Sequence, residues 1–279
     1  MALPTILLVD NGSRRAGSVL SLRGIAAELS SLTRLGIHPV SLQHADKIPS
    51  DALGGTPAET FTPYLQQRLE QGDREFLVLP LFFGPSRTLT SFITEQTTVL
   101  QSDFGHFNLS LASVLCPLPE GEPRLADILI DQIIAASPGH PPSRVVLVDH
   151  GSPIPEVTAV RSYLATQLRN QLEPDAELFE AVMERRNDPS YDFNGELLET
   201  VLNSAATEDA NSPITLSLLF MSPGRHAGQD GDIETICEKV RQQHPGLQIS
   251  ISPLVGAHPT LIKILNDRLQ ASLVQHELS

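Results

Sequence analysis

Cysteine and long apolar runs are both scarce in this sequence, and each shortage excludes a class of protein. Only two cysteines occur among 279 residues, Cys116 and Cys237, and they stand far apart in no CxxC pattern. This excludes a disulfide framework, a zinc ribbon and a cysteine-ligated iron–sulfur centre. No apolar run is long enough to span a membrane, and no basic segment precedes the first apolar run. We therefore expect a cytoplasmic protein without a membrane anchor or signal peptide.

Basic residues are also few. The chain has 19 Lys and Arg against 33 Asp and Glu, and its formal net charge is −14. Such a charge disfavours nucleic acid and anionic membranes, so neither is an expected partner. A small anionic ligand would have to be held by a local group of arginines. The G-x-G-x-x-G and Gly-Lys-Ser/Thr signatures of nucleotide-binding loops are missing too, so no nucleotide cofactor is predicted.

The sequence does contain an internal repeat. Residues 5–13 (TILLVDNGS) match residues 144–152 (RVVLVDHGS), residues 81–87 match 219–225, and residues 123–125 match 259–261 more weakly. The three pairs occur in the same order at nearly one spacing, which is close to half the chain. This spacing indicates a duplicated domain and not a solenoid of short repeats.

The stretch 137–143 (SPGHPPS) is rich in Pro and Gly and is therefore the predicted linker. We place a degenerate domain at residues 1–139 and the domain that carries the site at residues 140–279.

Each half alternates short apolar runs with amphipathic stretches. The predicted strands lie at residues 6–9, 37–42, 75–83, 107–114, 145–149, 177–183, 214–221 and 248–252. Helices are predicted between and after them, including one over 56–71 with Thr56 as its N-cap and Pro57 in its first turn. The alternation predicts an α/β fold with two tandem domains, each a mainly four-stranded parallel sheet covered by helices on both faces.

Two histidines follow strands of the second half, at the sheet edge where ligands of such folds bind. His150 follows the first strand of this half, and His226 follows the third. Imidazole binds first-row divalent metals and exchanges protons near neutral pH. Glu184, after the second strand, is a candidate third ligand or proton acceptor, although a Glu beside two arginines also fits a surface ion pair. We predict that His150, His226 and Glu184 are the metal-binding and catalytic residues.

Residues beside these three are predicted to bind substrate. Guanidinium groups pair with carboxylates through two parallel hydrogen bonds, and glycines let the backbone approach a ligand closely. The predicted substrate-binding residues are Gly151, Ser152, Arg185, Arg186, Ser222, Gly224 and Arg225.

The motifs resemble those of the sirohydrochlorin chelatases, the CbiX/SirB type of class II tetrapyrrole chelatases, in a two-domain form. The resemblance rests on residues 147–152 (LVDHGS), 218–228 (LLFMSPGRHAG) and 251–259 (ISPLVGAHP). It implies a pair of flavodoxin-like domains with a cleft between them. It also implies insertion of cobalt(II) or iron(II) into sirohydrochlorin, on the way to cobalamin or sirohaem.

Carried over to this sequence, the two histidines of the family match His150 and His226, and its carboxylate matches Glu184. The first half departs from the pattern, because Asn11 and Thr88 stand opposite the two histidines. We interpret it as a degenerate copy that forms one wall of the cleft.

The resemblance thus implies a metal chelatase that takes sirohydrochlorin or a related polycarboxylate tetrapyrrole as its partner. The divalent metal is a substrate, cobalt or iron with nickel as a further candidate, and no organic cofactor is expected. The duplication favours a pseudo-symmetric monomer. Two alternatives remain open: a non-catalytic carrier of metal or tetrapyrrole, and a metal-dependent hydrolase on a similar fold. The hydrolase would need a denser set of carboxylates than the second half obviously provides.

Overall fold

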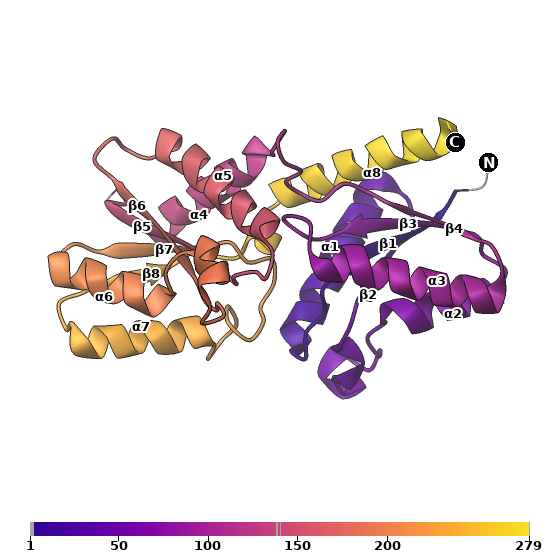
Figure 1. The fold of residues 1–279 in the computed structure, drawn as a ribbon, viewed down its shortest axis with the longest axis horizontal. Coiled ribbons are helices and arrows are strands. Elements are labelled where there is room, and N and C mark those ends of the chain that lie inside the picture. The colour runs from indigo at the N-terminus through magenta and orange to yellow at the C-terminus, as the bar shows by residue number, and fades with distance from the viewer. Residues whose placement is uncertain (1–2, 138, 140, 279) are drawn as a thin grey trace. The chain divides into compact units, whose positions relative to one another are not determined.

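The computed structural model describes residues 3–137, 139 and 141–278. They form two four-stranded sheets, each made of parallel strands and covered by helices (Figure 1). The predicted α/β fold with two such sheets is therefore confirmed. Residues 138 and 140 of the predicted linker lie outside the described residues. Two compact units divide the chain: Met1–Pro117 with Ile262–Ser279, and Leu118–Leu261.

The first unit is built on a sheet with the strand order β2-β1-β3-β4. Its strands are β1 (Thr5–Asp10), β2 (Ile37–Ser41), β3 (Glu75–Pro80) and β4 (Asn108–Leu111). Its helices are α1 (Ala16–Thr33), α2 (Phe61–Glu70), α3 (Ile93–Phe104), which continues the π-helical turn Thr88–Phe92, and the larger part of α8 (Thr260–Leu278). Short 3-10 turns at Ala45–Lys47 and Ser50–Leu53 follow β2.

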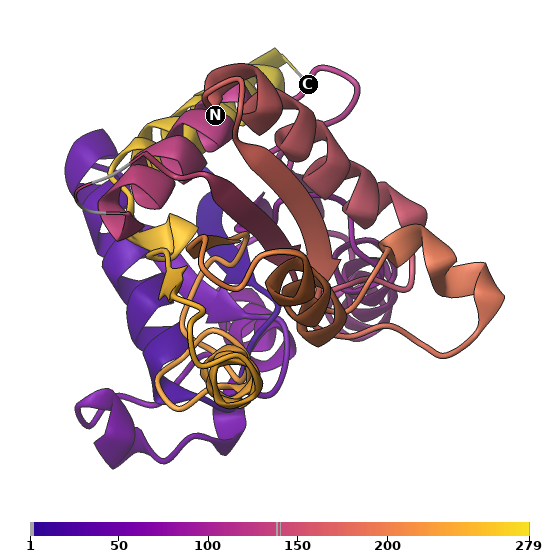
Figure 2. The same cartoon turned by 90° about the vertical axis from the view of Figure 1, so that its left-hand side faces the viewer.

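The second unit repeats this arrangement with the strand order β6-β5-β7-β8. Its strands are β5 (Arg144–Asp149), β6 (Glu177–Val182), β7 (Ile214–Leu218) and β8 (Ile249–Ile251). Its helices are α4 (Pro123–Ala136), α5 (Pro155–Gln171), α6 (Leu198–Glu208) and α7 (Asp232–Gln243), with 3-10 turns η4 (Pro189–Asn194) and η5 (Val255–Ala257). Helices α4 and α5 pack together, as do α6 and α7, and the two pairs cover opposite faces of this sheet (Figure 2).

Continuous apolar strands form the centre of each unit, as expected for parallel sheets buried on both faces. Every residue of β5 is buried, and its side chains alternate between the two helical layers. On one face, Val146 and Val148 pack with Leu202 of α6 and Val240 of α7 in one apolar cluster. This rigid centre holds the carboxyl ends of β5, β6 and β7 at one edge of the sheet.

Helices α4 and α8 are exchanged between the two repeats. Each follows the fourth strand of its own repeat, yet α4 belongs to the second unit and most of α8 to the first. Gln132 of α4 donates to the carbonyl of Leu254 at 2.9 Å, and Arg268 of α8 donates to the carbonyl of Val114 at 3.2 Å. The compact units therefore differ from the linear division at residue 139 that the repeat predicts.

The predicted helix over residues 56–71 begins later than expected. The structure starts α2 at Phe61 with Thr60 as the N-cap residue, so the assignment of Thr56 as N-cap was wrong. Arg23 donates to the carbonyls of Thr56 and Pro57, and Thr60 forms a parallel bridge with Ser41. These contacts hold the preceding residues in an extended path that local sequence does not reveal.

Several strands end earlier than the apolar runs predict. The runs 75–83 and 214–221 form strands only as far as Pro80 and Leu218. After each strand, one more backbone bond is made, from Leu81 to Val9 and from Leu219 to Val148. The chain then leaves the sheet and forms the loops at its edge. No helix among the described residues has the length and apolar content needed to cross a membrane.

Candidate metal centre

Three side chains predicted to bind metal converge at the edge of the second sheet. His150 directly follows β5, Glu184 follows β6, and His226 lies in the loop after β7. One ligand atom from each lies within 4.8 Å of the other two. The rings of His150 and His226 meet edge to face, with centroids 4.7 Å apart. This arrangement offers two imidazole nitrogens and one carboxylate oxygen to a single cation.

A tight backbone contact brings the loops of His150 and Glu184 together. The Glu184 amide donates to the carbonyl of His150 at 3.0 Å. Gly151 adopts a φ of +91°, and a Cβ atom there would lie only 2.0 Å from the carbonyl oxygen of Glu184. Only glycine fits this turn, because any other side chain would be strained and would push the two loops apart.

The loop between β7 and α7 folds back on itself and buries His226. The carbonyl of His226 accepts from Ile233 in the first turn of α7 at 3.1 Å. A Cβ atom on Gly231 would lie 2.5 Å from the same carbonyl oxygen. The His226 side chain is only 7% exposed, whereas that of Glu184 is 49% exposed. The His226 side chain is thus fixed inside the protein, whereas the Glu184 side chain faces solvent.

The electrostatic surroundings of His226 favour its neutral form. Burial lowers the pKa of His226, and the adjacent His150 lowers it further, while Glu184 and Asp232 oppose the shift. Its Nδ1 lies 2.8 Å from an Asp232 carboxylate oxygen, and its Nε2 lies 3.5 Å from Glu184. Neutral imidazole is the metal-binding form. A carboxylate at Nδ1 that leaves Nε2 for the metal is the usual support of a histidine ligand.

A pocket of about 230 Å³ adjoins this group. It is lined by His150, Gly151, Ser152, Pro153, Glu184, Arg185, Arg186 and Tyr191. Arg185 donates to the carbonyl of Gly195 at 2.9 Å, and Arg186 donates to the Tyr191 hydroxyl at 2.7 Å. Four of the predicted substrate-binding residues thus lie beside the ligands, with two guanidinium groups at the wall of the pocket.

The other three predicted substrate-binding residues belong to the loop of His226. Arg225 is 70% exposed and lies 3.5 Å from Glu184 and 3.1 Å from Asp232. It therefore adds a third positive charge near the ligand group. Ser222 and Gly224 precede it in the same loop, outside the residues that line the pocket.

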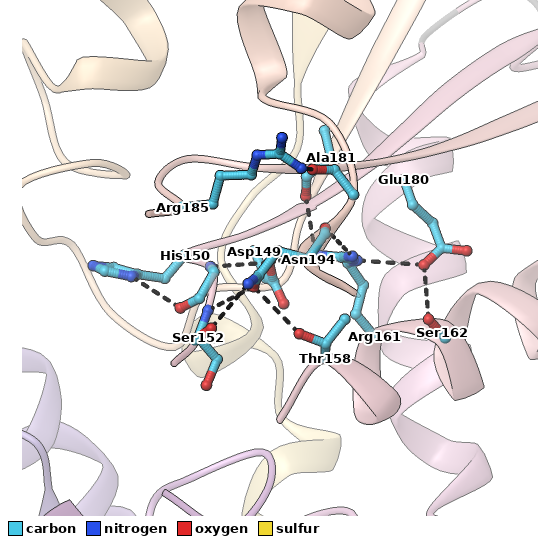
Figure 3. A network of polar contacts seen from close by, with 12 residues as sticks. Asp149, His150, Ser152, Thr158, Arg161, Ser162, Glu180, Ala181, Arg185 and Asn194 are labelled. Atoms are coloured by element: carbon cyan, nitrogen blue, oxygen red, sulfur yellow. Dashed lines mark hydrogen bonds and ion pairs between the residues drawn. The ribbon is translucent and has the colours of Figure 1, made fainter. Parts of the chain in front are cut away.

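A buried polar network behind His150 was missed by sequence reasoning (Figure 3). Arg161 of α5 donates to Asp149 at 2.7 Å and to the carbonyl of Asn194 at 2.7 Å. Burial raises the pKa of Asp149, and Arg161 opposes that shift. Arg161 stands beside Leu164 and Leu168 on the apolar face of α5, and a charge on such a face is a signal that could have been used. The role of Asn194 depends on tertiary contacts that leave no local pattern.

The first unit has a corresponding edge without the ligands. Backbone bonds from Leu42 to Asp10 and from Met183 to Asp149 align Gln43 with Glu184. Asn11 and Gln43 therefore occupy the positions of His150 and Glu184, and Thr88 corresponds to His226 by the spacing of the sequence repeat. Amides and a hydroxyl neither carry a charge nor supply a base near pH 7, so this edge offers a much weaker metal site.

Comparisons with known proteins match the second half of the chain to a family and the whole chain to a fold. Residues 144–272 match the CbiX family model, and this range includes His150, Glu184 and His226. No curated protein matches the chain.

Solved structures resemble the fold over nearly its whole length. SirB from Bacillus subtilis with Fe³⁺ has 16% identity and a TM-score of 0.71, and covers 98% of this chain and 96% of its own. Sirohydrochlorin chelatase SirB from Bacillus subtilis subspecies spizizenii, in complex with cobalt, has 16% identity and a TM-score of 0.64 over the same shares. CbiX from denitrifying bacteria, called the terminal enzyme for siroheme biosynthesis, has 15% identity and a TM-score of 0.58 over 95% and 97%. These similarities establish the fold.

Proposed function

We propose that this chain, whose residues 144–272 match the CbiX family model, inserts a divalent metal ion into sirohydrochlorin or a related polycarboxylate tetrapyrrole. The observation that carries the proposal is the convergence of His150, Glu184 and His226 beside an arginine-lined pocket. The SirB structures with Fe³⁺ and with cobalt point to iron or cobalt as the metal. Nickel remains a candidate on ligand chemistry, which discriminates poorly among these ions.

The metal substrate is bound before transfer by the two imidazoles and the carboxylate. His226 presents Nε2 from a buried, neutral ring, and Asp232 at Nδ1 keeps that ring oriented. Glu184 is half exposed and can release the ion without opening the core. Holding a partly dehydrated cation at a fixed point removes much of the cost of stripping its water during the reaction.

Two protons must leave the macrocycle when a divalent ion enters it. As the metal moves to the pyrrole nitrogens, it vacates an imidazole nitrogen and a carboxylate oxygen of the protein. We assign these atoms, on His226 or His150 and on Glu184, as the proton acceptors. Asp232 stabilises the imidazolium that forms at His226, because a carboxylate 2.8 Å from Nδ1 compensates its charge. The reaction written in this way consumes no nucleotide or organic cofactor.

The carboxylates of the macrocycle need positive partners, since the chain as a whole carries a net charge of −14. Arg185 and Arg186 at the pocket and Arg225 beside Glu184 supply them locally. Gly151 and Ser152 line the same pocket, where the absence of a bulky side chain lets a macrocycle edge approach the backbone. Guanidinium groups bind carboxylates in a planar, two-bond geometry that also orients the ligand.

The test is anaerobic metallation of sirohydrochlorin with Co²⁺ or Fe²⁺, followed by the change in visible absorption. Wild-type protein should complete many turnovers, whereas His150→Ala and His226→Ala should lose the catalysed rate while keeping their circular dichroism spectra. Product limited to one equivalent per chain would identify a carrier. Normal rates in both variants would refute the assignment of the site.

A further inference from the structure

The backbone on the C-terminal side of His150 is held from beneath by two buried side chains, Asn194 and Arg161 (Figure 3). Asn194 accepts from the Ser152 amide at 2.8 Å and donates to the Ser152 carbonyl at 2.9 Å. It therefore binds both polar groups of one residue, as a neighbouring strand would. Asn194 is fully buried, so water does not compete for these bonds.

Arg161 connects Asn194 to the end of β5. It donates to the Asp149 carboxylate and to the Asn194 carbonyl, both at 2.7 Å, and its side chain is 3% exposed. The same Asp149 oxygen accepts from the Gly151 amide at 3.1 Å. The Gly151 amide and both backbone polar groups of Ser152 are thus fixed by one continuous network of buried polar groups.

The His150 side chain has little support of its own. Its Nδ1 lies 3.2 Å from the carbonyl of the next residue, Gly151, and its ring touches His226. Figure 3 shows the imidazole pointing away from Asn194 and Arg161, at the free end of the network. Its position therefore depends on the backbone from which it projects.

The first unit is an internal control for what the fold itself requires. Helices α1 and α5 begin at the same distance after Asp10 and Asp149, which places Leu22 at the position of Arg161. Backbone bonds from Ser41 to Glu59 and from Val182 to Glu196 align these two glutamates, and Pro57 precedes the first by two residues as Asn194 precedes the second. The unit without the histidine thus also lacks both supporting residues, yet it forms the same sheet.

We propose that Asn194 and Arg161 are positioning residues, which hold the Gly151–Ser152 backbone so that the His150 imidazole stays at the metal. The inference rests on the proposed function, because it assumes that His150 binds metal there. The network is present in the unit that carries the histidines, and Leu22 and Pro57 stand at the corresponding places in the unit that lacks them. The first unit forms the same sheet without this buried charged network, so the sheet does not require it. We therefore assign the network to the site.

The experiment measures Co²⁺ affinity by the visible d–d absorption of the bound ion, in the full chain without tetrapyrrole. Asn194→Ala and Arg161→Leu should each weaken Co²⁺ binding by roughly 10- to 100-fold, the usual loss when the support of a ligand is removed. In the chelation assay, the KM for Co²⁺ should rise by a similar factor, and kcat at saturating Co²⁺ should change less. Asn194→Asp keeps the volume and loses the donors, so it serves if the Ala variant does not fold.

Arg144→Leu is the matched control. Arg144 is also a buried arginine of this unit, but it begins β5 at the far end of the strand and donates to carbonyls of Ala205, Asp209 and Ser212. The Arg144→Leu variant should have a lower melting temperature than wild type and an unchanged affinity for Co²⁺. Equal weakening by Arg144→Leu would show that affinity follows stability, and would overturn the inference.

Wild-type affinity in folded Asn194 and Arg161 variants would also overturn it, while the proposed function stood. Loss of the proposed function has a different signature: His150→Ala would then bind Co²⁺ as tightly as wild type, and both proposals would fall together.

Discussion

Asp10 and Asp149 occupy equivalent positions in the two units, and their surroundings predict opposite responses to the same substitution. Asp149 is paired with Arg161, whereas Asp10 has Leu22 at the corresponding position. Oδ1 of Asp10 is buried and finds no hydrogen-bond partner among the described residues. Burial raises the pKa of Asp10 to about 6 from 3.8, despite hydrogen bonds that lower it. The folded first unit therefore holds a carboxyl group that is costly to ionise.

The sign and size of the effect follow from this pKa. Since Asp10 binds its proton more tightly in the folded chain, its favourable contribution is complete below about pH 3.8 and is lost as the pH rises through 6. A shift of about two units corresponds to roughly 3 kcal/mol of lost stability at high pH, at about 1.4 kcal/mol per unit. Asp10→Asn removes the ionisation, so between pH 4 and pH 8 its stability relative to wild type should rise by about 2.5 kcal/mol.

The assay is urea unfolding at both pH values, read by pulsed hydrogen exchange of peptides from β1 and β3, which reports on the first unit alone. Comparing two pH values cancels the constant cost of burying an amide. Asp149→Asn is the counterpart, and it should destabilise the second unit by about 3 kcal/mol or more at pH 8, because Arg161 loses its buried partner. A pH-independent effect of Asp10→Asn, or destabilisation like that of Asp149→Asn, would refute the reasoning.

Three further outcomes are expected around the metal site. Gly151→Ala should abolish Co²⁺ binding in absorption titrations, because the new Cβ would lie 2.0 Å from the Glu184 carbonyl oxygen; unchanged binding would show that this contact is dispensable. Asp232→Asn should weaken Co²⁺ binding roughly 10-fold by removing the carboxylate at Nδ1 of His226, and calorimetry that finds equal affinity would contradict it. Arg186→Met should raise the KM for the tetrapyrrole several-fold and leave Co²⁺ affinity unchanged; a KM like that of wild type would exclude Arg186 from carboxylate binding.

The fold and the ligand group were predictable because both depend on local signals. Buried parallel strands are continuous apolar runs, and a duplicated pattern doubles the evidence for each. His150 and His226 could be placed at one sheet edge because each follows a strand. The carboxyl ends of neighbouring parallel strands then bring these two residues together, although they are far apart in the sequence.

The supporting residues were not predictable in the same way. Asn194 lies in a short turn after β6, and its bonds to Ser152 join residues far apart in sequence. Asp232 begins α7, where an acidic residue also fits the helix dipole and so gives no sign of its contact with His226. The start of α2 was misplaced for the same reason, since Arg23 holds the preceding residues from another helix.

The exchange of α4 and α8 has a consequence for any half-length version of this protein. A chain that stopped after the helix of its fourth strand would carry a final helix suited to a sheet other than its own. Two such chains could cover both sheets only by exchanging their final helices, as in a domain-swapped homodimer. When both halves belong to one chain, this exchange of helices is intramolecular and does not depend on protein concentration. The first repeat can therefore lack the histidines and still supply helix α4 to the sheet of the second repeat.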